Sequence, residues 1–398
     1  MARTEPAAER FAIRARRIFD GAALLPASRT TVVVDKGLIS AIETSGTRVE
    51  GHMPVHELGD ATLLPGLIDA HTHLVFDASD TAAVNVQSAV HRDLAAAMRL
   101  RARAMMDHGI TSVRDLGDRD YLSLMLREET AKQPAAGPRI VAAGPPITST
   151  GGHCWFLGCE ADDAEAITAA VDDHALRGVD VIKVMATGGR MTPTTVPHES
   201  QYSLKELRVA ADRAHFHGLP AAAHVHGRRG IGDALAAGFD TLEHVSFMTA
   251  TGIDPDPGII DAIAASRVIV SITLGLLPGV HASPLMESLT PRILAHVKDM
   301  ADRGVRITLG PDSGLNPAKP HTVLPYAVEQ FAGAGVGAAA ALAAATQTAA
   351  AACGLSGVAG RIAPGREADL LAVTGNPLAN IADIHNVAAV YHAGVRVV

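Results

Sequence analysis

The order of apolar and polar positions along the chain predicts a parallel barrel. Eight short apolar runs can be marked, ending near Leu74, Gly117, Ile147, Gly188, Gly227, Phe247, Leu277 and Gly314. Most are apolar on both faces, as expected of parallel strands covered by helices. Helix-like segments separate most of them, such as ELRVAADRAHFHG before the fifth run and PRILAHVKDMADRG before the eighth. Strand and helix alternating eight times predicts an α/β fold of the (β/α)₈ TIM-barrel type.

The two ends of the chain carry a different pattern. Residues 10–60 and 358–398 contain short β-like segments around Gly and Pro turns, among them TTVVVDKGLISAIE and VAAVYHAGVRVV. Neither end makes a core alone. We therefore expect a small β-sandwich domain built from residues 1–62 plus 358–398, beside a barrel of residues 63–357. The Ala-rich stretch from Gly333 to Ala352 contains Thr346, Gln347 and Thr348, so it predicts a packed helix and not a membrane span.

Composition narrows the class of protein. The chain has 398 residues, of which 48% are hydrophobic and only 19% are charged, which indicates a folded globular protein. The net charge of −8 disfavours nucleic acid as a partner. The N-terminal MARTEPAAERFAIRARRIFDG shows no apolar signal-peptide core. Three cysteines, Cys154, Cys159 and Cys353, form no Cys-x-x-Cys pair, and their odd number fits a reducing, cytoplasmic location. Cys154 and Cys159 could be ligands, but buried free thiols are the preferred interpretation.

Two histidines close the first apolar run. His71 and His73 end LLPGLIDAHTHL, and side chains two apart on a strand point to the same face. In a barrel that face is the interior, and the C-terminal end of the strand is the active-site mouth. A His-x-His pair is common by chance, but at the end of a first barrel strand it predicts metal ligands.

A lysine lies inside the fourth apolar run. Lys183 is flanked by Val181 and Met185 on the same strand face, and lysine is almost never fully buried unless it is paired. One interpretation is an ion pair with a buried carboxylate. The other is an amine kept neutral by desolvation, which adds CO₂ and becomes a carbamate able to bridge two metal ions. The surrounding histidines favour the second interpretation.

The remaining candidate ligands follow the fifth, sixth and eighth runs. His224 and His226 repeat the same-face pair, and we assign His224 as a ligand and His226 as a substrate contact, with a ligand-orienting role open for His226. His244 follows Glu243, and its imidazole is the preferred ligand of the two. Asp312 can hold a metal ion and act as the general base. Asp before Ser-Gly is also typical of a turn without a metal ion. The presence of five other candidate ligands favours the metal-binding interpretation.

These residues carry a resemblance to a known family. His71-Thr-His73, Lys183, His224, His244 and Asp312, in this order, resemble the amidohydrolase superfamily, as do PGLIDAHTHL and the C-terminal GRIAPGREADLLAV followed by NPL. IKVMATGG, AAAHVHG and DTLEH resemble its imidazolonepropionase-like and prolidase-like branch, which includes dipeptidases, carboxypeptidases and the fungal ochratoxin amidase. Pro311 departs from the pattern of the branch, and the segment GGHCWFLGC matches no known role.

The resemblance implies a cofactor and a ligand set. Two divalent metal ions are expected, with zinc as the default for imidazole and carboxylate ligands. His71, His73 and Asp312 would hold the first ion, His224 and His244 the second, and a CO₂-derived carbamate on Lys183 would bridge them. Two ions so placed generate a hydroxide near neutral pH, and Asp312 would pass its proton to the leaving amine.

This chemistry predicts a metal-dependent amidohydrolase that cleaves the C–N bond of a small molecule. Peptides or N-acyl amino acids are the first expectation and cyclic amides the second. Lactone, ester or phosphotriester hydrolysis at the same site is an alternative. Two other hypotheses for the function are a mononuclear deaminase, in which Lys183 is unmodified, and a non-catalytic scaffold.

Loops after the strands are expected to set specificity. Arg190 with His226 could bind a substrate carboxylate, although Arg190 also reads as a surface charge. Trp155 could form an aromatic wall or pack in the core. The expected partner is a small molecule, with no nucleic acid and no membrane, and a homo-oligomer is left open. The candidate substrate contacts are His153, Trp155, Arg190, His198, Tyr202, His226 and His321.

Overall fold

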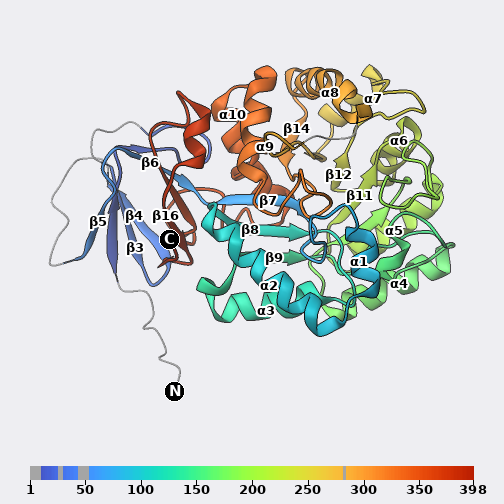
Figure 1. Cartoon of the computed structure of the whole chain (residues 1–398), viewed down its shortest axis with the longest axis horizontal. Helices are drawn as coiled ribbons and strands as arrows, with labels where there is room; N and C mark the ends of the chain where they lie inside the picture. Colours follow the sequence, from blue (N-terminus) through green and yellow to red (C-terminus); the bar gives the residue numbers. More distant parts are fainter. Residues whose placement is uncertain (1–9, 26–29, 44–52, 281–283) are drawn as a thin grey trace.

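Eight parallel strands form the barrel at the centre of the larger domain. The computed structural model describes residues 10–25, 30–43, 53–280 and 284–398 (Figure 1). The prediction that the N-terminal segment is not a signal peptide falls partly on residues 1–9, which lie outside the described residues. The strands are β7 (Leu67–Thr72), β8 (Ile110–Asp115), β9 (Arg139–Ala142), β10 (Ile182–Met185), β11 (Ala221–Val225), β12 (Thr241–His244), β13 (Ile269–Ile272) and β14 (Arg306–Leu309). They coincide with the eight apolar runs, and the predicted barrel is confirmed.

Short bridges close the ring of strands. Strands β7 to β9 form one parallel sheet and β10 to β14 another. A bridge between Ile147 and Val184 joins the sheets on one side, and a bridge between Thr72 and Ser313 joins them on the other. The register pairs Met185 with His224 and Val225 with His244. Residues far apart in the sequence therefore meet at the C-terminal ends of the strands, as in other barrels of this type.

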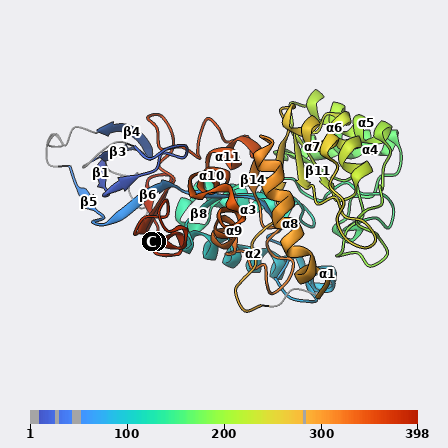
Figure 2. The same ribbon diagram turned by 90° about the horizontal axis from the view of Figure 1, so that it is seen from above.

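Helices surround the strands, as Figure 2 shows from a second direction. Their apolar faces pack on strands that are buried on both sides, which explains the continuous apolar runs. The helices are α1 (Ala82–Ser88), α2 (His91–Asp107), α3 (Leu122–Lys132), α4 (Ala164–Arg177), α5 (Leu204–Phe216), α6 (Arg228–Ala237), α7 (Pro257–Ala264), α8 (Pro284–Asp302), α9 (Leu324–Phe331), α10 (Ala338–Ala344) and α11 (Gln347–Ala352). Short helical turns are η1 (Pro134–Ala136), η2 (Trp155–Leu157), η3 (Ala332–Val336) and η4 (Ile381–His385).

Both ends of the chain build a small β-sandwich beside the barrel (Figure 1). One sheet has the order β4-β3-β1-β5, and the other has the order β17-β16-β15-β6-β2. Strand β15 pairs with β6 in antiparallel fashion, so the C-terminal segment completes a sheet that the N-terminal segment begins. The strands are β1 (Phe11–Arg14), β2 (Arg17–Ile18), β3 (Thr31–Asp35), β4 (Leu38–Glu43), β5 (Val55–Glu57), β6 (Ala61–Pro65), β15 (Leu370–Thr374), β16 (Val387–His392) and β17 (Val395–Arg396).

The Ala-rich stretch is not one helix. Gly335 and Gly337 both have a φ of 92°, which interrupts the helical backbone between α9 and α10, and a second break at Thr346 separates α10 from α11. A left-handed φ is open to glycine at little cost. The prediction of a packed segment is right, and the prediction of a single helix is wrong. Within the described residues, no helix has the length and apolarity to cross a membrane.

Candidate functional site

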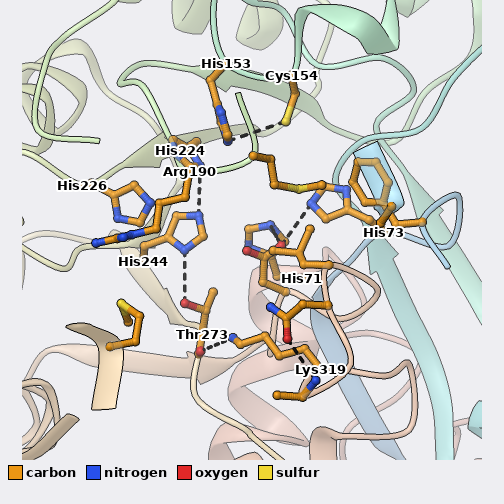
Figure 3. A pocket seen from close by; sticks show the side chains of 18 of the residues that line it. His71, His73, His153, Cys154, Arg190, His224, His226, His244, Thr273 and Lys319 are labelled. Carbon is orange, nitrogen blue, oxygen red and sulfur yellow. Dashed lines mark hydrogen bonds and ion pairs between the residues drawn. The ribbon is translucent and has the colours of Figure 1, made fainter. Parts of the chain in front are cut away.

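Six sequence-predicted residues converge on one cavity. His71 and Lys183 lie within strands β7 and β10, and His224 and His244 lie at the ends of β11 and β12. His73 and Asp312 lie just beyond the ends of β7 and β14. All six line a cavity of about 1230 Å³, whose interior Figure 3 shows from close by. The structure thus brings together every candidate ligand that the sequence indicated.

Asp312 faces the two histidines of the first strand. Its Oδ1 lies 3.4 Å from His71 Nε2 and 3.3 Å from His73 Nε2. The other nitrogen of His73, Nδ1, is 2.9 Å from the carbonyl oxygen of Gly117 and donates to it. When the ring is neutral, Nδ1 carries the proton and the lone pair of Nε2 faces the cavity.

A second cluster of imidazoles lies beside the first. One ring nitrogen from each of His224, His226 and His244 lies within 4.8 Å of the other two. One ring nitrogen each from His71 and His244 and one carboxylate oxygen of Asp312 also lie within 4.8 Å of one another. His244 belongs to both clusters, so two ions could be held side by side. The distances do not separate His224 from His226 as the better ligand.

Hydrogen bonds fix the orientation of these rings. His224 Nε2 lies 3.0 Å from the carbonyl oxygen of Gly188, and His226 Nδ1 lies 2.8 Å from Ser246 Oγ. His244 Nε2 lies 3.0 Å from His224 Nδ1. With its Nε2 bonded to the Gly188 carbonyl, His224 presents Nδ1 to the cavity.

Lys183 is buried within strand β10. It is 1% exposed, and its Nζ has no hydrogen-bond partner among the described residues. Burial lowers the pKa of its ammonium group to about 8, although the charges of Glu243 and Asp312 act in the opposite direction. A substantial fraction of the amine is therefore neutral near pH 8, which is the form that adds CO₂.

Burial also keeps most imidazoles neutral. It lowers the pKa of His71 to about 4 and that of His226 to about 3, and it lowers the pKa values of His224 and His244 well below their usual range. Burial alone would raise the pKa of Asp312, but the adjacent histidines hold it well below its usual range. Neutral imidazoles and an ionised carboxylate are the forms that bind metal ions.

A buried charge network supports the first cluster, and sequence reasoning missed most of it. Arg114 Nη2 donates to Glu243 Oε1 at 2.9 Å, and Glu243 Oε2 lies 2.9 Å from His71 Nδ1. Arg114 Nε also donates to the carbonyl oxygen of Ala70 at 2.7 Å. The sequence signal was present: a charged residue inside the apolar run ITSVRDLG resembles the case of Lys183.

Two further polar groups hold the ends of β7 and β14. Asp69 accepts from the backbone N–H of His71 at 3.0 Å and from Ser313 Oγ at 3.0 Å. Lys319 Nζ donates to the carbonyl oxygens of Thr273 and Pro311 at 2.7 and 2.6 Å. These contacts tie the loops that carry the candidate ligands to one another.

The predicted substrate contacts divide into two groups. His153, Trp155, Arg190 and His226 line the cavity. Trp155 is 42% exposed, so it lies in the cavity wall and not in the core.

Tyr202, His198 and His321 are not part of the cavity lining. The hydroxyl of Tyr202 donates to the carbonyl oxygen of Ala161 at 2.7 Å, and His321 Nε2 lies 3.0 Å from the carbonyl oxygen of His73. Direct contact with a substrate is not supported for these three. His321 instead holds the backbone beside a candidate ligand.

The donor set fits divalent metal ions. Imidazole nitrogens and a carboxylate oxygen form two clusters that share His244, and the buried amine of Lys183 in the same cavity has no hydrogen-bond partner within the described part of the chain. A parallel barrel with such a set at the C-terminal mouth of its strands defines a metal-dependent barrel hydrolase.

Comparison with known proteins agrees with this class. The model of the Amidohydrolase family matches residues 62–397, and the chain belongs to this family, whose members generally use divalent metal ions. It is therefore a hydrolase of carbon–nitrogen bonds. The chain is 30% identical over 367 residues to an ochratoxinase of Aspergillus niger, covering 83% of this chain and 74% of that protein.

Solved structures show the same fold. A Xaa-Pro dipeptidase with bound methionine superposes with a TM-score of 0.85 at 27% identity, covering 98% of this chain and 99% of the other. The structure of the A. niger ochratoxinase superposes with a TM-score of 0.82 at 23% identity, covering 98% of this chain and 96% of the other. The predicted branch of the superfamily is confirmed.

Proposed function

We propose that this amidohydrolase cleaves an amide or peptide bond in a small molecule that carries a carboxylate, such as a dipeptide or an N-acyl amino acid. The observation that supports the proposal most is the convergence of two imidazole clusters, Asp312 and Lys183 in one cavity that Arg190 also lines. The similarity to a Xaa-Pro dipeptidase and to an ochratoxinase points the same way.

The proposed ligand roles are those that the family resemblance implies. His71, His73 and Asp312 would hold one ion, and His224 and His244 the other. Lys183, as a carbamate formed from CO₂ with loss of a proton, would bridge them. Zinc is the default for this donor set. When bound, the ions supply Lewis-acid activation of water and of the scissile carbonyl.

Asp312 would move the proton. Its carboxylate lies within 3.4 Å of both first-strand imidazoles, and its low pKa keeps it ionised before the attack. It would take the proton of the attacking water and deliver it to the nitrogen of the leaving amine, so that the same residue acts first as base and then as acid.

The cavity wall would orient the substrate. Arg190 can pair with a carboxylate in a charge-assisted hydrogen bond, and His226 lies close enough for the Arg190 charge to lower its pKa further. His153 and Trp155 also line the cavity and would contact the substrate. This arrangement favours substrates with a carboxylate on one side of the scissile amide.

The wider organisation is part of the same proposal. We divide the chain into a sandwich domain of residues 1–62 plus 358–398 and a barrel domain of residues 63–357. We expect a cytoplasmic enzyme that acts on small molecules.

A substrate panel with metal analysis tests the proposal. Dipeptides, N-acyl amino acids, cyclic amides and lactones are compared with the protein at two equivalents of zinc. We expect hydrolysis of the first two classes, and Asp312→Asn should lower kcat by a factor of 10² or more, as for loss of a general base, while most of the metal is kept. Preference for lactones, or full kcat in Asp312→Asn, would contradict the proposed substrate class or the proposed base, respectively.

A further inference from the structure

The cavity is larger than a dipeptide needs. Its volume is about 1230 Å³, whereas pockets that bury most of a drug-sized ligand have about 300–1,000 Å³. A dipeptide is smaller than such a ligand. The cavity therefore has room for a substrate that carries a large additional group.

Much of the lining is apolar and has no role in the chemistry described above. Helix α8 contributes Met286, Thr290, Ile293, Leu294 and Val297 to the cavity. These positions recur at spacings of three and four residues, which is the pattern of one helix face. One largely apolar face of α8 is therefore directed into the cavity.

Three large apolar side chains of the lining are exposed to solvent. Val84 in α1, Trp155 in η2 and Val280 in the loop between β13 and α8 are 63%, 42% and 36% exposed, and all three line the cavity. Single exposed apolar side chains are common, but several around one cavity indicate a binding surface. These three side chains and the α8 face form what we call the apolar lining.

Methionines are frequent in the same cavity. Four of the eleven methionines of the chain line it, namely Met185, Met191, Met248 and Met286. Methionine is unbranched, has three rotatable bonds and fills irregular space. Such a lining adapts to a flexible aliphatic chain and does not require one fixed shape.

The charged groups of the cavity fit an acylated amino acid better than a dipeptide. Arg190 lies close to His226 and can pair with the carboxylate of the substrate (Figure 3). Among the described residues of the lining, the carboxylates are Asp80 and Asp312. Asp312 has a role in the proposed chemistry, and Asp80 is exposed, where an ion pair contributes little. The ammonium group of a dipeptide therefore lacks a buried counter-charge, whereas an acyl chain needs none.

We propose that the substrate is an N-acyl amino acid with a medium or long aliphatic acyl chain, and that the apolar lining binds this chain. The proposal rests on the proposed function and narrows its substrate class. Hydrolysis adds one water across the C–N bond: the hydroxyl goes to the acyl carbon, a proton goes to the nitrogen, and a fatty acid and a free amino acid are released.

Fluorescence of the single tryptophan tests the apolar lining without hydrolysis. Trp155 is the one Trp of the chain, and an aliphatic chain beside it removes water from the indole and shifts its emission to shorter wavelength. Metal-loaded protein is titrated with straight-chain carboxylates from butyrate to decanoate, which share one head group. We expect Kd to fall about fourfold per methylene, as for burial of a CH₂ group. The absence of a shift, or a Kd that does not depend on chain length, would overturn the proposal.

A pair of variants tests where the chain lies. Val84→Asp places a charge in the apolar lining, in the first turn of α1, where Asp is well tolerated. Val90→Asp is the matched control, because Val90 is 61% exposed, is the N-cap of α2 and is not part of the cavity lining. We expect Val84→Asp to raise the Kd of decanoate at least tenfold more than that of butyrate, and Val90→Asp to keep the wild-type ratio. A wild-type ratio in Val84→Asp would refute the placement of the chain.

A substrate series tests the acyl specificity. N-acetylalanine, N-octanoylalanine, N-benzoylalanine and the dipeptide leucylalanine are compared, and kcat/KM for N-octanoylalanine should exceed each of the others at least tenfold. A preference for the dipeptide or for the benzoyl compound would contradict a long aliphatic chain. If none is hydrolysed while the carboxylates bind according to chain length, the proposed function fails and the apolar lining stands as a chain-binding site. If N-acetylalanine is hydrolysed and binding does not depend on chain length, the proposed function stands and the long chain is refuted.

Discussion

The buried ion pair between Arg114 and Glu243 gives the sharpest expectation about stability and metal binding. Its nitrogen and oxygen are 2.9 Å apart, and the two side chains are 1% and 0% exposed. Glu243→Gln keeps the shape of the side chain and removes its charge. The guanidinium of Arg114 then remains buried without a counter-charge, and His71 Nδ1 loses a carboxylate neighbour at 2.9 Å.

Two magnitudes follow. Removing one partner of a buried pair costs about 3–5 kcal/mol, because an uncompensated charge stays behind. Loss of the carboxylate that orients a ligating histidine lowers metal affinity by about 10–100-fold. The exposed pair of Arg14 and Glu57 has a similar distance, 2.8 Å, with side chains that are 33% and 62% exposed. Glu57→Gln is therefore the matched control and should cost about 0–1 kcal/mol.

The assay is denaturant unfolding of metal-free protein, which keeps the binding energy of the ions out of the comparison. Competition with a chelator then gives metal affinity separately. The double variant Arg114→Met with Glu243→Leu removes both charges. Its loss in free energy of unfolding should be smaller, by at least about 2 kcal/mol, than the sum of the losses in the two single variants. Its metal affinity should stay low, because no carboxylate faces His71.

Two results would refute this reasoning. If Glu243→Gln costs no more than Glu57→Gln, the pair does not carry an uncompensated buried charge. If the double variant regains full metal affinity, the carboxylate does not orient His71.

Three further expectations concern the cavity. Lys183→Ala should lose most bound metal, and short carboxylic acids should restore part of it, as followed by metal analysis; metal content equal to the wild type would exclude a bridging role. Arg190→Met should raise KM for carboxylate-bearing substrates about tenfold or more and leave esterified analogues unaffected, and an equal effect on both would contradict carboxylate binding. The metal-free protein should lose stability as pH falls from about 6.5 toward 4. The pKa values of His71, His153 and His226 are about 4, 3 and 3 in the fold against an ordinary 6.5, so the unfolded chain binds more protons in this range. A denaturation midpoint that is flat across this range would contradict the pKa shifts.

Local pattern was enough to predict the barrel and to locate its candidate ligands. Each strand is marked by its own apolar run. The C-terminal ends of parallel barrel strands lie at the same end of the barrel, and this does not depend on the conformation of the connecting loops. His71 and Lys183 could therefore be placed without any knowledge of contacts. The break at Gly335 had a local signal in the glycines of the Ala-rich stretch, and the prediction missed it because it gave more weight to the high helix propensity of the alanines.

Contacts between distant strands were beyond the sequence pattern. Arg114 and Glu243 are 129 residues apart, and nothing near either residue indicates the other. Tyr202 and His198 were predicted to contact the substrate because they follow the fourth strand. In a long loop, however, some side chains point toward the cavity and others point away from it. Order along the chain gives the end of the barrel on which a loop lies, and it does not give the direction of each side chain.

Asp312 shows that the turn interpretation and the metal-ligand interpretation of one residue are compatible. Asp before Ser-Gly is typical of a turn, and Asp312 does have a left-handed φ of 62°, a conformation in which Asp and Asn are enriched. Its N–H donates to the carbonyl oxygen of His71 at 2.9 Å, so the turn is fixed against β7. The same turn directs the carboxylate to within 3.4 Å of His71 and His73. A left-handed backbone costs about 1–2 kcal/mol in a non-glycine residue, and His244, with a φ of 72°, carries the same cost at the end of β12. Strain of this kind gathers where side-chain direction matters, and here it falls on two of the six candidate ligands.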